Sequence, residues 1–321
     1  MSNKKHCTHC TIIASATHLF VDCLCVCALY LLSAVHSREE IITALLTYNV
    51  IAFCSQPLTG IVADRISDRK ILLHASMILL ATAVIITDFY QLHHTAPLVT
   101  AIVLGAGNSL FHVWGGKETA LASNNDIVSL GIFVAPGAMG LSIGYLFHSQ
   151  QLLYTSIAAI MVLSAAYTHI NNIHNSTSRQ TVAKENPREY SLTFTLSAMA
   201  TITAIVVLRS FAGEEFSAAT VKSDALIFII GAISTIGKIA GGIMTKQMGL
   251  KGTIAILLAA TALCYPLRHT GICTVLCGLF FINCTMPITL YFANKILKGK
   301  EGLAFGILAA ALIPGYLIAT L

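Results

Sequence analysis

Long runs of apolar residues constrain this chain more than any other feature of its sequence. They recur from end to end, and many reach the roughly 20 residues that an α-helix needs to cross a bilayer core. Of 321 residues, 56% are hydrophobic and 10% are charged, against about 25% charged in soluble domains. The runs do not alternate as barrel strands would. We therefore predict an all-α polytopic protein of the cell (inner or plasma) membrane.

The runs predict eleven membrane-spanning helices. Their expected ranges are 10–34, 40–62, 70–90, 96–115, 127–147, 150–169, 190–211, 225–245, 252–267, 271–292 and 302–321. The first run is too long and too polar to be a cleaved signal peptide.

Lysine and arginine residues predict the orientation, because they favour cytoplasmic loops. With the N-terminus inside, the inner segments hold Lys4, Lys5, Arg65, Arg69, Lys70, Lys117, Arg179, Lys184, Arg188, Lys246, Lys251, Lys295, Lys298 and Lys300. The outer segments hold only Arg38, Arg209, Lys222 and Arg268, while Lys238 lies within a span and is expected to extend towards the inner surface. The bias predicts a cytoplasmic N-terminus and explains the positive net charge without a nucleic-acid partner.

One polar segment, 171–189, divides the chain into two halves. We predict a six-helix bundle over 1–170, a cytosolic linker over 171–189 and a five-helix bundle over 190–321. Short motifs repeat between the halves: Gly60–Lys70 matches Gly241–Lys251 in position, and Gly131–Gly140 matches Gly306–Gly315. Paired halves with glycine and proline interruptions at matching places are typical of transporters built from repeats.

The first of these motifs resembles a family. Gly60-x-x-x-Asp64-Arg65 followed by Arg69-Lys70 is similar to the loop between helices two and three of the major facilitator superfamily. Gly131-x-x-x-Ala135-Pro136-x-x-x-Gly140 resembles the antiporter motif of that superfamily. Gly105–His112, Leu208-Arg209-Ser210, Met286–Asn294 and His18-x-x-x-Asp22 look like fosmidomycin-resistance-type efflux transporters.

The chain departs from these patterns in several places. Where the superfamily patterns have a glycine, a basic residue and a glycine, this chain has Ser67, Asp68 and Ala135. Val113 occupies the position of the proline that commonly follows the Phe-His pair. The resemblance implies twelve helices in two bundles, of which the sequence provides eleven, so we expect the last helix to be absent.

The resemblance also implies that helices one, four, seven and ten line a central cavity. On the first, Thr11, Ser15, His18, Asp22 and Cys25 share one face at steps of three and four. A carboxylate in a span costs about 2.5–3.5 kcal/mol on insertion scales and marks a functional site by default. We therefore predict Asp22 and His18 as proton-coupling residues; the alternative is a hydrogen-bonded pair that only supports packing.

Polar residues on the other three helices are candidates for solute binding. Asn108 and His112 share a face of the fourth helix, although His112 could be structural. Ser197, Thr201 and Arg209 lie on the seventh and Asn283 on the tenth. Arg209 could bind an anion, pair with Glu214 or Glu215 as a gate, or extend to the interface.

Two further groups have structural roles by resemblance. Gly60, Asp64, Arg65, Asp68, Arg69 and Lys70 are expected to form a conformational latch, the alternative being a solvated loop. Gly131, Pro136, Gly137 and Gly140 are expected to form a helix-packing motif.

Together these features predict a secondary active transporter that exports a small, anionic or drug-like solute by proton antiport. Uptake by proton symport and a non-transporting sensor are the alternatives. The sequence contains no nucleotide-binding loop and no catalytic cluster. Cys7 and Cys10 do not complete a metal motif, because no second pair of cysteines follows them. We therefore expect no enzyme activity, no cofactor and no metal, with the bilayer, protons and the solute as partners of a monomer.

Overall fold

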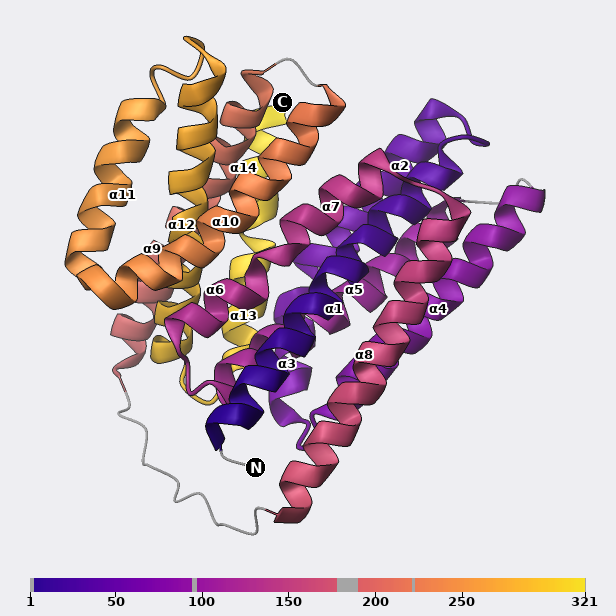
Figure 1. Ribbon diagram of the computed structural model, residues 1–321, viewed down its shortest axis with the longest axis horizontal. Helices are drawn as coiled ribbons and strands as arrows, with labels where there is room; N and C mark the ends of the chain where they lie inside the picture. The colour runs from indigo at the N-terminus through magenta and orange to yellow at the C-terminus, as the bar shows by residue number, and fades with distance from the viewer. Residues whose placement is uncertain (1–2, 94–96, 178–189, 221–222, 321) are drawn as a thin grey trace.

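Every described element of the computed structural model is a helix (Figure 1). The structure describes residues 3–93, 97–177, 190–220 and 223–320. The helices are α1 (Asn3–Leu32), α2 (Arg38–Asn49), the π-helix η1 (Val50–Cys54), α3 (Gln56–Arg65), α4 (Lys70–His93), α5 (Pro97–Ala122), α6 (Ile127–Val134), α7 (Pro136–Leu146), α8 (Gln150–Thr177), α9 (Leu192–Ala218), α10 (Asp224–Met248), α11 (Leu250–Cys264), α12 (Ile272–Ile296), α13 (Glu301–Ala310) and α14 (Leu312–Thr320).

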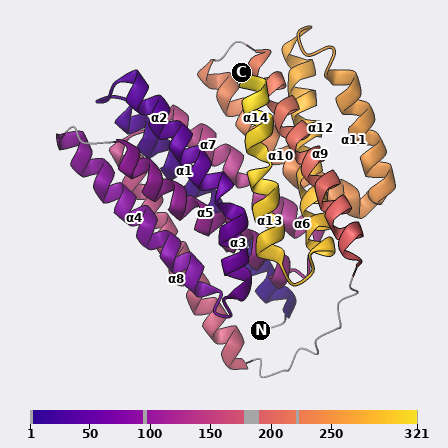
Figure 2. The same ribbon diagram turned by 180° about the vertical axis from the view of Figure 1, so that it is seen from behind.

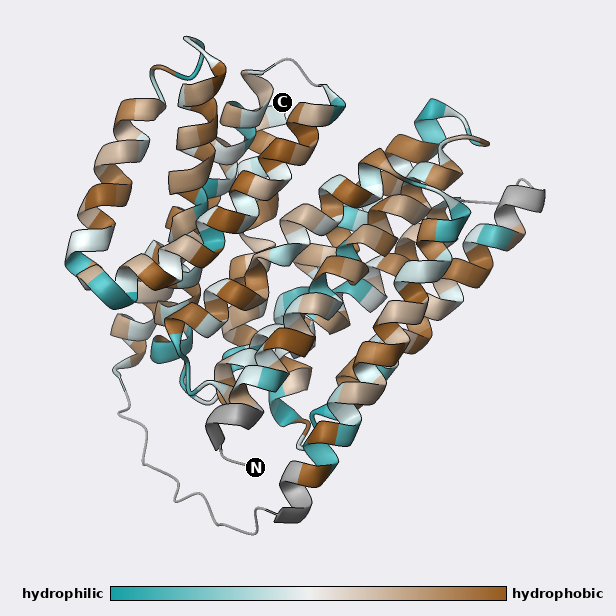
Figure 3. Cartoon of the chain, viewed as in Figure 1, coloured by the Kyte–Doolittle hydropathy of each residue, from teal (hydrophilic) through white to brown (hydrophobic). Residues whose placement is uncertain are grey.

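These helices confirm the predicted all-α membrane architecture. Ten described segments are long and apolar enough to span a bilayer, and α11 is a shorter apolar helix at the predicted ninth span. Three spans are composite, because α2–η1–α3, α6–α7 and α13–α14 each continue one another. Figure 3 shows apolar residues along the helices and hydrophilic residues mostly near their ends. Large apolar side chains such as Leu58, Ile85 and Val162 are exposed on the helices, where lipid would cover them.

Several boundaries differ from the sequence prediction: α1 begins at Asn3 and not at residue 10, and α5 and α9 end at Ala122 and Ala218 and not at 115 and 211. The sixth span was expected to end near residue 169, but α8 continues to Thr177 and takes in the first part of the predicted linker. The rest of that linker, 178–189, lies outside the described residues.

The helices form two bundles, α1–α8 and α9–α14, which approach at the end that holds the N-terminus and diverge towards the end that holds the C-terminus (Figures 1 and 2). We call these the closed end and the open end. At the closed end α3 packs against α13 and α6 against α10. Glycines bring the backbones together: a Cβ at Gly60 would overlap the backbone of Gly302, and one at Gly306 would overlap that of Gln56. Close backbone approach is the usual role of small residues between membrane helices.

Replacing Gly60 with valine should separate the bundles at the closed end. A side chain there has no space against Gly302, and overpacking costs typically 1–3 kcal/mol. We predict at least about tenfold faster hydrogen exchange in α3 and α13. Gly252→Val is the matched control, because a Cβ at Gly252 meets nothing within 4 Å. Unchanged exchange in Gly60→Val would contradict this assignment.

Candidate functional site

A cavity of about 360 Å³ lies between the two bundles. Helices α1, α5, α9 and α12, the first, fourth, seventh and tenth spans, all contribute to its wall, as the resemblance implies. Its charged and imidazole side chains are divided by bundle. His18, Asp22 and His112 come from the first bundle, and Arg209 and Lys238 from the second. Most of the remaining wall is apolar.

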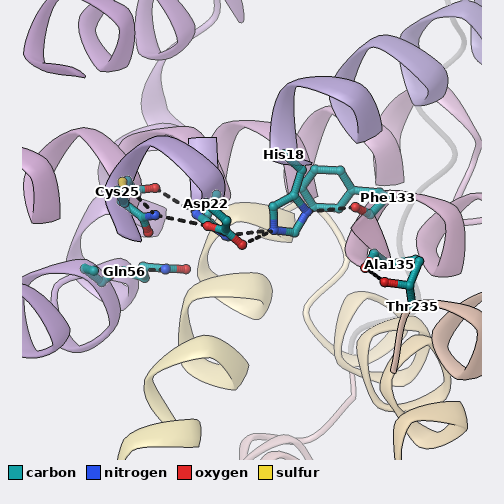
Figure 4. Close-up of polar contacts among 10 residues, drawn as sticks. His18, Asp22, Cys25, Gln56, Phe133, Ala135 and Thr235 are labelled. Atoms are coloured by element: carbon teal, nitrogen blue, oxygen red, sulfur yellow. Dashed lines mark hydrogen bonds and ion pairs between the residues drawn. The ribbon is translucent and has the colours of Figure 1, made fainter. Parts of the chain in front are cut away.

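His18, Asp22 and His112 form one buried group, which we call the His–Asp–His cluster. His18 Nε2 lies 3.2 Å from Asp22 Oδ2, and His112 Nε2 lies 3.5 Å from Asp22 Oδ1. The two Nε2 atoms are 2.9 Å apart. All three residues are at most 7% exposed, and Figure 4 shows His18 and Asp22 pointing towards each other on α1.

The break between α6 and α7 positions His18. Pro136 has no N–H to bond the carbonyl of Ile132, and the interrupted helix also leaves nearby carbonyls available to side chains. Ser15 Oγ donates to the carbonyl of Ile132, and His18 Nδ1 donates to that of Phe133 over 2.8 Å (Figure 4). The helix break therefore fixes both the position and the hydrogen-bonding state of the His18 ring.

Both imidazoles direct their Nε2 atom towards the cluster. His112 Nδ1 faces the carbonyl of Asn108 at 3.0 Å, as His18 Nδ1 faces that of Phe133. A carbonyl only accepts, so each Nδ1 carries a hydrogen, and each neutral ring leaves a lone pair on Nε2. Two lone pairs and a carboxylate thus converge. The 2.9 Å distance between the two Nε2 atoms fits a hydrogen that the rings share.

Two neighbouring residues shape the cluster. Asn108 Nδ2 donates to Asp22 Oδ1 over 3.3 Å, so this predicted solute ligand instead supports the carboxylate and does not line the cavity. Gly137 lets α7 cross directly over the cluster, because a Cβ there would collide with both His18 and Asp22. Gly140 similarly meets the carbonyl of Leu19, and Gly131 meets that of Lys238.

Arg209 and Lys238 face the cluster from the other bundle without a counter-ion of their own. Among the described residues no hydrogen bond or ion pair reaches either side chain, and Arg209 Nη1 is buried without a partner. Glu215, a predicted partner of Arg209, pairs instead with Arg268 at 3.0 Å. Lys238 was expected to extend to the inner surface, but it lines the cavity and interacts electrostatically with Asp22 and Arg209.

The other predicted solute ligands lie elsewhere. Ser197 and Thr201 are exposed on α9 and hydrogen-bond to carbonyls of their own helix. Asn283 bonds to Ser234 and to the carbonyl of Leu279, between α12 and α10. Sequence spacing put these residues on a plausible face, but it could not show which face meets the cavity.

Residues of the predicted latch lie at the closed end. Asp64 accepts hydrogen bonds from the N–H groups of Gly302 and Leu303, both at 2.9 Å, and so caps α13 of the other bundle. Lys117 lies 3.4 Å from the same carboxylate. Negative charge at a helix N-terminus is favourable, so Asp64 ties the bundles together.

The remaining latch residues act within the first bundle. Arg69 pairs with the buried Glu118 at 3.3 Å, a partner that the sequence did not reveal. Lys70 Nζ donates to Asn172, and Asp68 accepts from the Lys70 N–H. No polar contact was found that gives Arg65 a role in the described part of the chain.

The sequence also did not reveal a second connection between the bundles, the ion pair of Asp126 and Lys246. Asp126 caps α6 through the Ser129 N–H and pairs with Lys246 of α10 at 3.2 Å. Asn294 of α12 donates to Asn125 at 3.0 Å. Asn124 and Asn125 have positive φ of 52° and 58°, a conformation that asparagine tolerates well, and form the turn that places Asp126.

The His–Asp–His cluster is also the group, within the described ranges, whose ligand atoms could hold a metal ion, since they lie within 4.8 Å of one another. The two histidines lie far apart in the sequence, so no motif suggested it. Because Lys238 acts electrostatically on Asp22, a divalent ion would meet a positive charge on the opposite wall.

No protein-family model and no curated protein matches the sequence. Solved structures do match. The E. coli fucose:proton symporter FucP has a TM-score of 0.65 at 14% identity, over 97% of this chain and 90% of that chain. A bacterial homologue of the iron transporter ferroportin, in an outward-facing state, has 0.62 at 12% over 98% and 90%. A D-xylose–proton symporter has 0.57 at 12% over 99% and 89%.

The chain has the major facilitator fold. At these identities the likeness shows the fold alone, which confirms the predicted fold class of an all-α protein with membrane-length helices. The narrower resemblance to fosmidomycin-resistance-type transporters gains no support from these matches and stays a prediction.

The Asp126–Lys246 pair should stabilise the closed end equally from pH 5 to 8. Burial raises the pKa of Asp126, but hydrogen bonds from Ser129 and Lys246 lower it more, so the pKa lies below the ordinary 3.8. A lowered carboxyl pKa gives stability that is present above 3.8 and lost only as the pH falls through the lower folded value. We predict that Asp126→Asn costs about 0.2–1 kcal/mol, because the pair is partly exposed.

The measurement is the difference in melting temperature between wild type and Asp126→Asn at each pH. Asparagine still caps a helix well, so this variant isolates the ion pair. A difference that grew or vanished between pH 5 and 8 would show that Asp126 titrates there and would contradict the assignment.

Proposed function

We propose that the protein is a proton-coupled secondary active transporter that moves a small solute by alternating access. The observation that carries this proposal is the His–Asp–His cluster, in which two Nε2 atoms and a carboxylate converge in the cavity between the two bundles. A protonatable carboxylate at membrane depth is typical of proton pathways, and midplane sites between repeats are typical of transporters.

The neighbours of the cluster support a proton there. On α1, Cys23 and Cys25 both interact electrostatically with Asp22, and the Cys25 sulfur lies 3.7 Å from Asn108 Nδ2. On α2 Tyr48 contacts the same region, and Lys238 of α10 and Arg209 of α9 supply positive charge. α7 contributes the uncharged residues Gly137, Ala138 and Leu141 to the cavity wall. A single proton shared among Asp22 and the two Nε2 atoms would relieve their repulsion and add one positive charge. A divalent ion would add two.

The closed end supports alternating access. Its contacts are the Asp64 cap on α13, the Asp126–Lys246 pair and the glycine contacts of α3 with α13. The charge bias predicts that this end faces the cytoplasm, so the structure would be an outward-open state. Breaking the same contacts would open the cavity inward, because each joins one bundle to the other.

For direction we propose export in exchange for protons, as the resemblance to efflux transporters implies. An inward-moving proton gains about 2.3 kcal/mol per 100 mV of membrane potential. Proton-coupled uptake is a second candidate. It is favoured by the charge arrangement, because a proton on the cluster would release Lys238 from the field of Asp22 and so favour an anion in the cavity.

Replacing Asp22 with asparagine should abolish coupling, because the variant keeps the size of the side chain but cannot take up the shared proton. The assay uses inverted membrane vesicles with an acidified lumen and a panel of radiolabelled sugars, organic anions and drug-like cations. We expect wild-type protein to accumulate one of them in exchange for protons and Asp22→Asn to lose this accumulation.

Ser197→Ala is the matched control and should transport normally, since Ser197 is exposed on α9 away from the cavity. Solute loss from acidified vesicles would indicate uptake instead. Two results would contradict the assignment of a proton to the cluster. One is proton-coupled solute transport by Asp22→Asn at the wild-type rate; the other is stabilisation of the protein by Zn²⁺ or Mn²⁺ but not by acid.

A further inference from the structure

The charges that line the cavity do not balance. Arg209 and Lys238 bring two positive charges, and among the described residues that line the cavity Asp22 is the one carboxylate. Neutral His18 and His112 rings with the hydrogen on Nδ1, the atom that faces a carbonyl in each, add no charge to the wall. With Asp22 ionised the wall therefore carries one excess positive charge, and a proton on the cluster adds another.

The excess charge lies on side chains that are poised for a ligand. Arg209 Nη1 is buried and has no hydrogen-bond partner among the described residues. Lys238 lines the same cavity and acts electrostatically on Arg209. A cation at membrane depth normally pairs with an acid or lines a route for solutes or ions. Glu215, one of the two acids that the sequence offered as a partner of Arg209, pairs instead with Arg268.

The rest of the wall is built for an apolar body. Leu29 and Leu141 approach from the first bundle, and Met286, Leu290 and Leu308 from the second. A cavity of about 360 Å³ is at the lower end of the range for small-molecule sites. It is therefore large enough for a short apolar chain or a ring together with one polar head.

From these observations we propose that the solute is an amphipathic organic monoanion, with its carboxylate between Arg209 and Lys238 and its apolar part against the leucine-rich wall. This inference names the solute class of the proposed transporter and to that extent rests on the proposed function. The planar guanidinium of Arg209 would bind the carboxylate in a bidentate manner, and Lys238 would act as a point charge. One negative charge offsets the excess positive charge that the wall carries when the cluster holds no added proton.

Octanoate is the probe that tests this class, with octanol and octylammonium as probes of the same apolar tail. Binding is measured by calorimetry on the purified protein in lipid nanodiscs, and empty nanodiscs correct for partition into lipid. We expect octanoate to bind at least tenfold more tightly than either matched probe. Arg209→Gln and Lys238→Gln should each weaken octanoate binding about tenfold or more and leave octanol binding within threefold.

Arg268→Gln is the matched control, because Arg268 lies in the same bundle but pairs with Glu215 outside the cavity. Octanol binding as tightly as octanoate to wild-type protein would overturn the inference, and this comparison needs no variant. Full octanoate affinity in both folded variants would also overturn it. The calorimetric measurement needs no proton gradient, so it tests the solute class separately from transport. If octanoate binds but is not transported with protons, the solute class is upheld and the proposed transport function is rejected. Coupled transport of octylammonium would do the reverse.

Discussion

The hydrogen bond from His18 Nδ1 to the carbonyl of Phe133 is the contact on which the candidate site depends. It exists because Pro136 interrupts the fifth span and leaves backbone oxygens that a continuous helix would use. It fixes the His18 tautomer, turns Nε2 towards Asp22 and His112, and so creates a cluster of acceptors. The same break is bridged from the second bundle, where Thr235 donates to the carbonyl of Ala135. One proline thus links the cluster geometry to the interface between the bundles.

This arrangement connects the two ends of the molecule. Close packing of α6 and α7 on α1 requires Gly137 and Gly140, while packing of α6 on α10 uses Gly131 and Gly242. Any change in the cluster that moves α7 also moves an element in contact with α10, and α10 carries both Lys238 and the Lys246 partner of Asp126. Charge in the cavity and closure of the far end therefore share the same helices, which is a physical route for coupling.

Much of the fold could be predicted from the sequence, because membrane helices are specified by length and hydropathy. Gly60 and Gly306, which belong to the motifs that repeat between the halves, lie where α3 packs against α13. The cluster was half predicted: His18 and Asp22 share a helix face at a spacing of four, but His112 joins them only through tertiary packing. Ser197, Thr201 and Asn283 show the limit of such reasoning, since the amphipathic pattern of a helix buried in lipid does not reveal which face meets a cavity. Lys238 was assigned to the interface because snorkelling is the common behaviour of a lysine in a span, whereas the opposing Asp22 makes a cavity position favourable.

Both imidazoles carry hydrogen on Nδ1 and direct Nε2 towards a shared proton. Nitrogen-15 chemical shifts of histidine-labelled protein in lipid report this directly, with His18→Gln and His112→Gln providing the assignments. We predict Nδ1–H tautomers for both rings at high pH, and a proton shared between the two Nε2 atoms as the pH is lowered, lost in Asp22→Asn. An Nε2–H tautomer on both neutral rings, or shifts that do not respond to pH, would contradict the account.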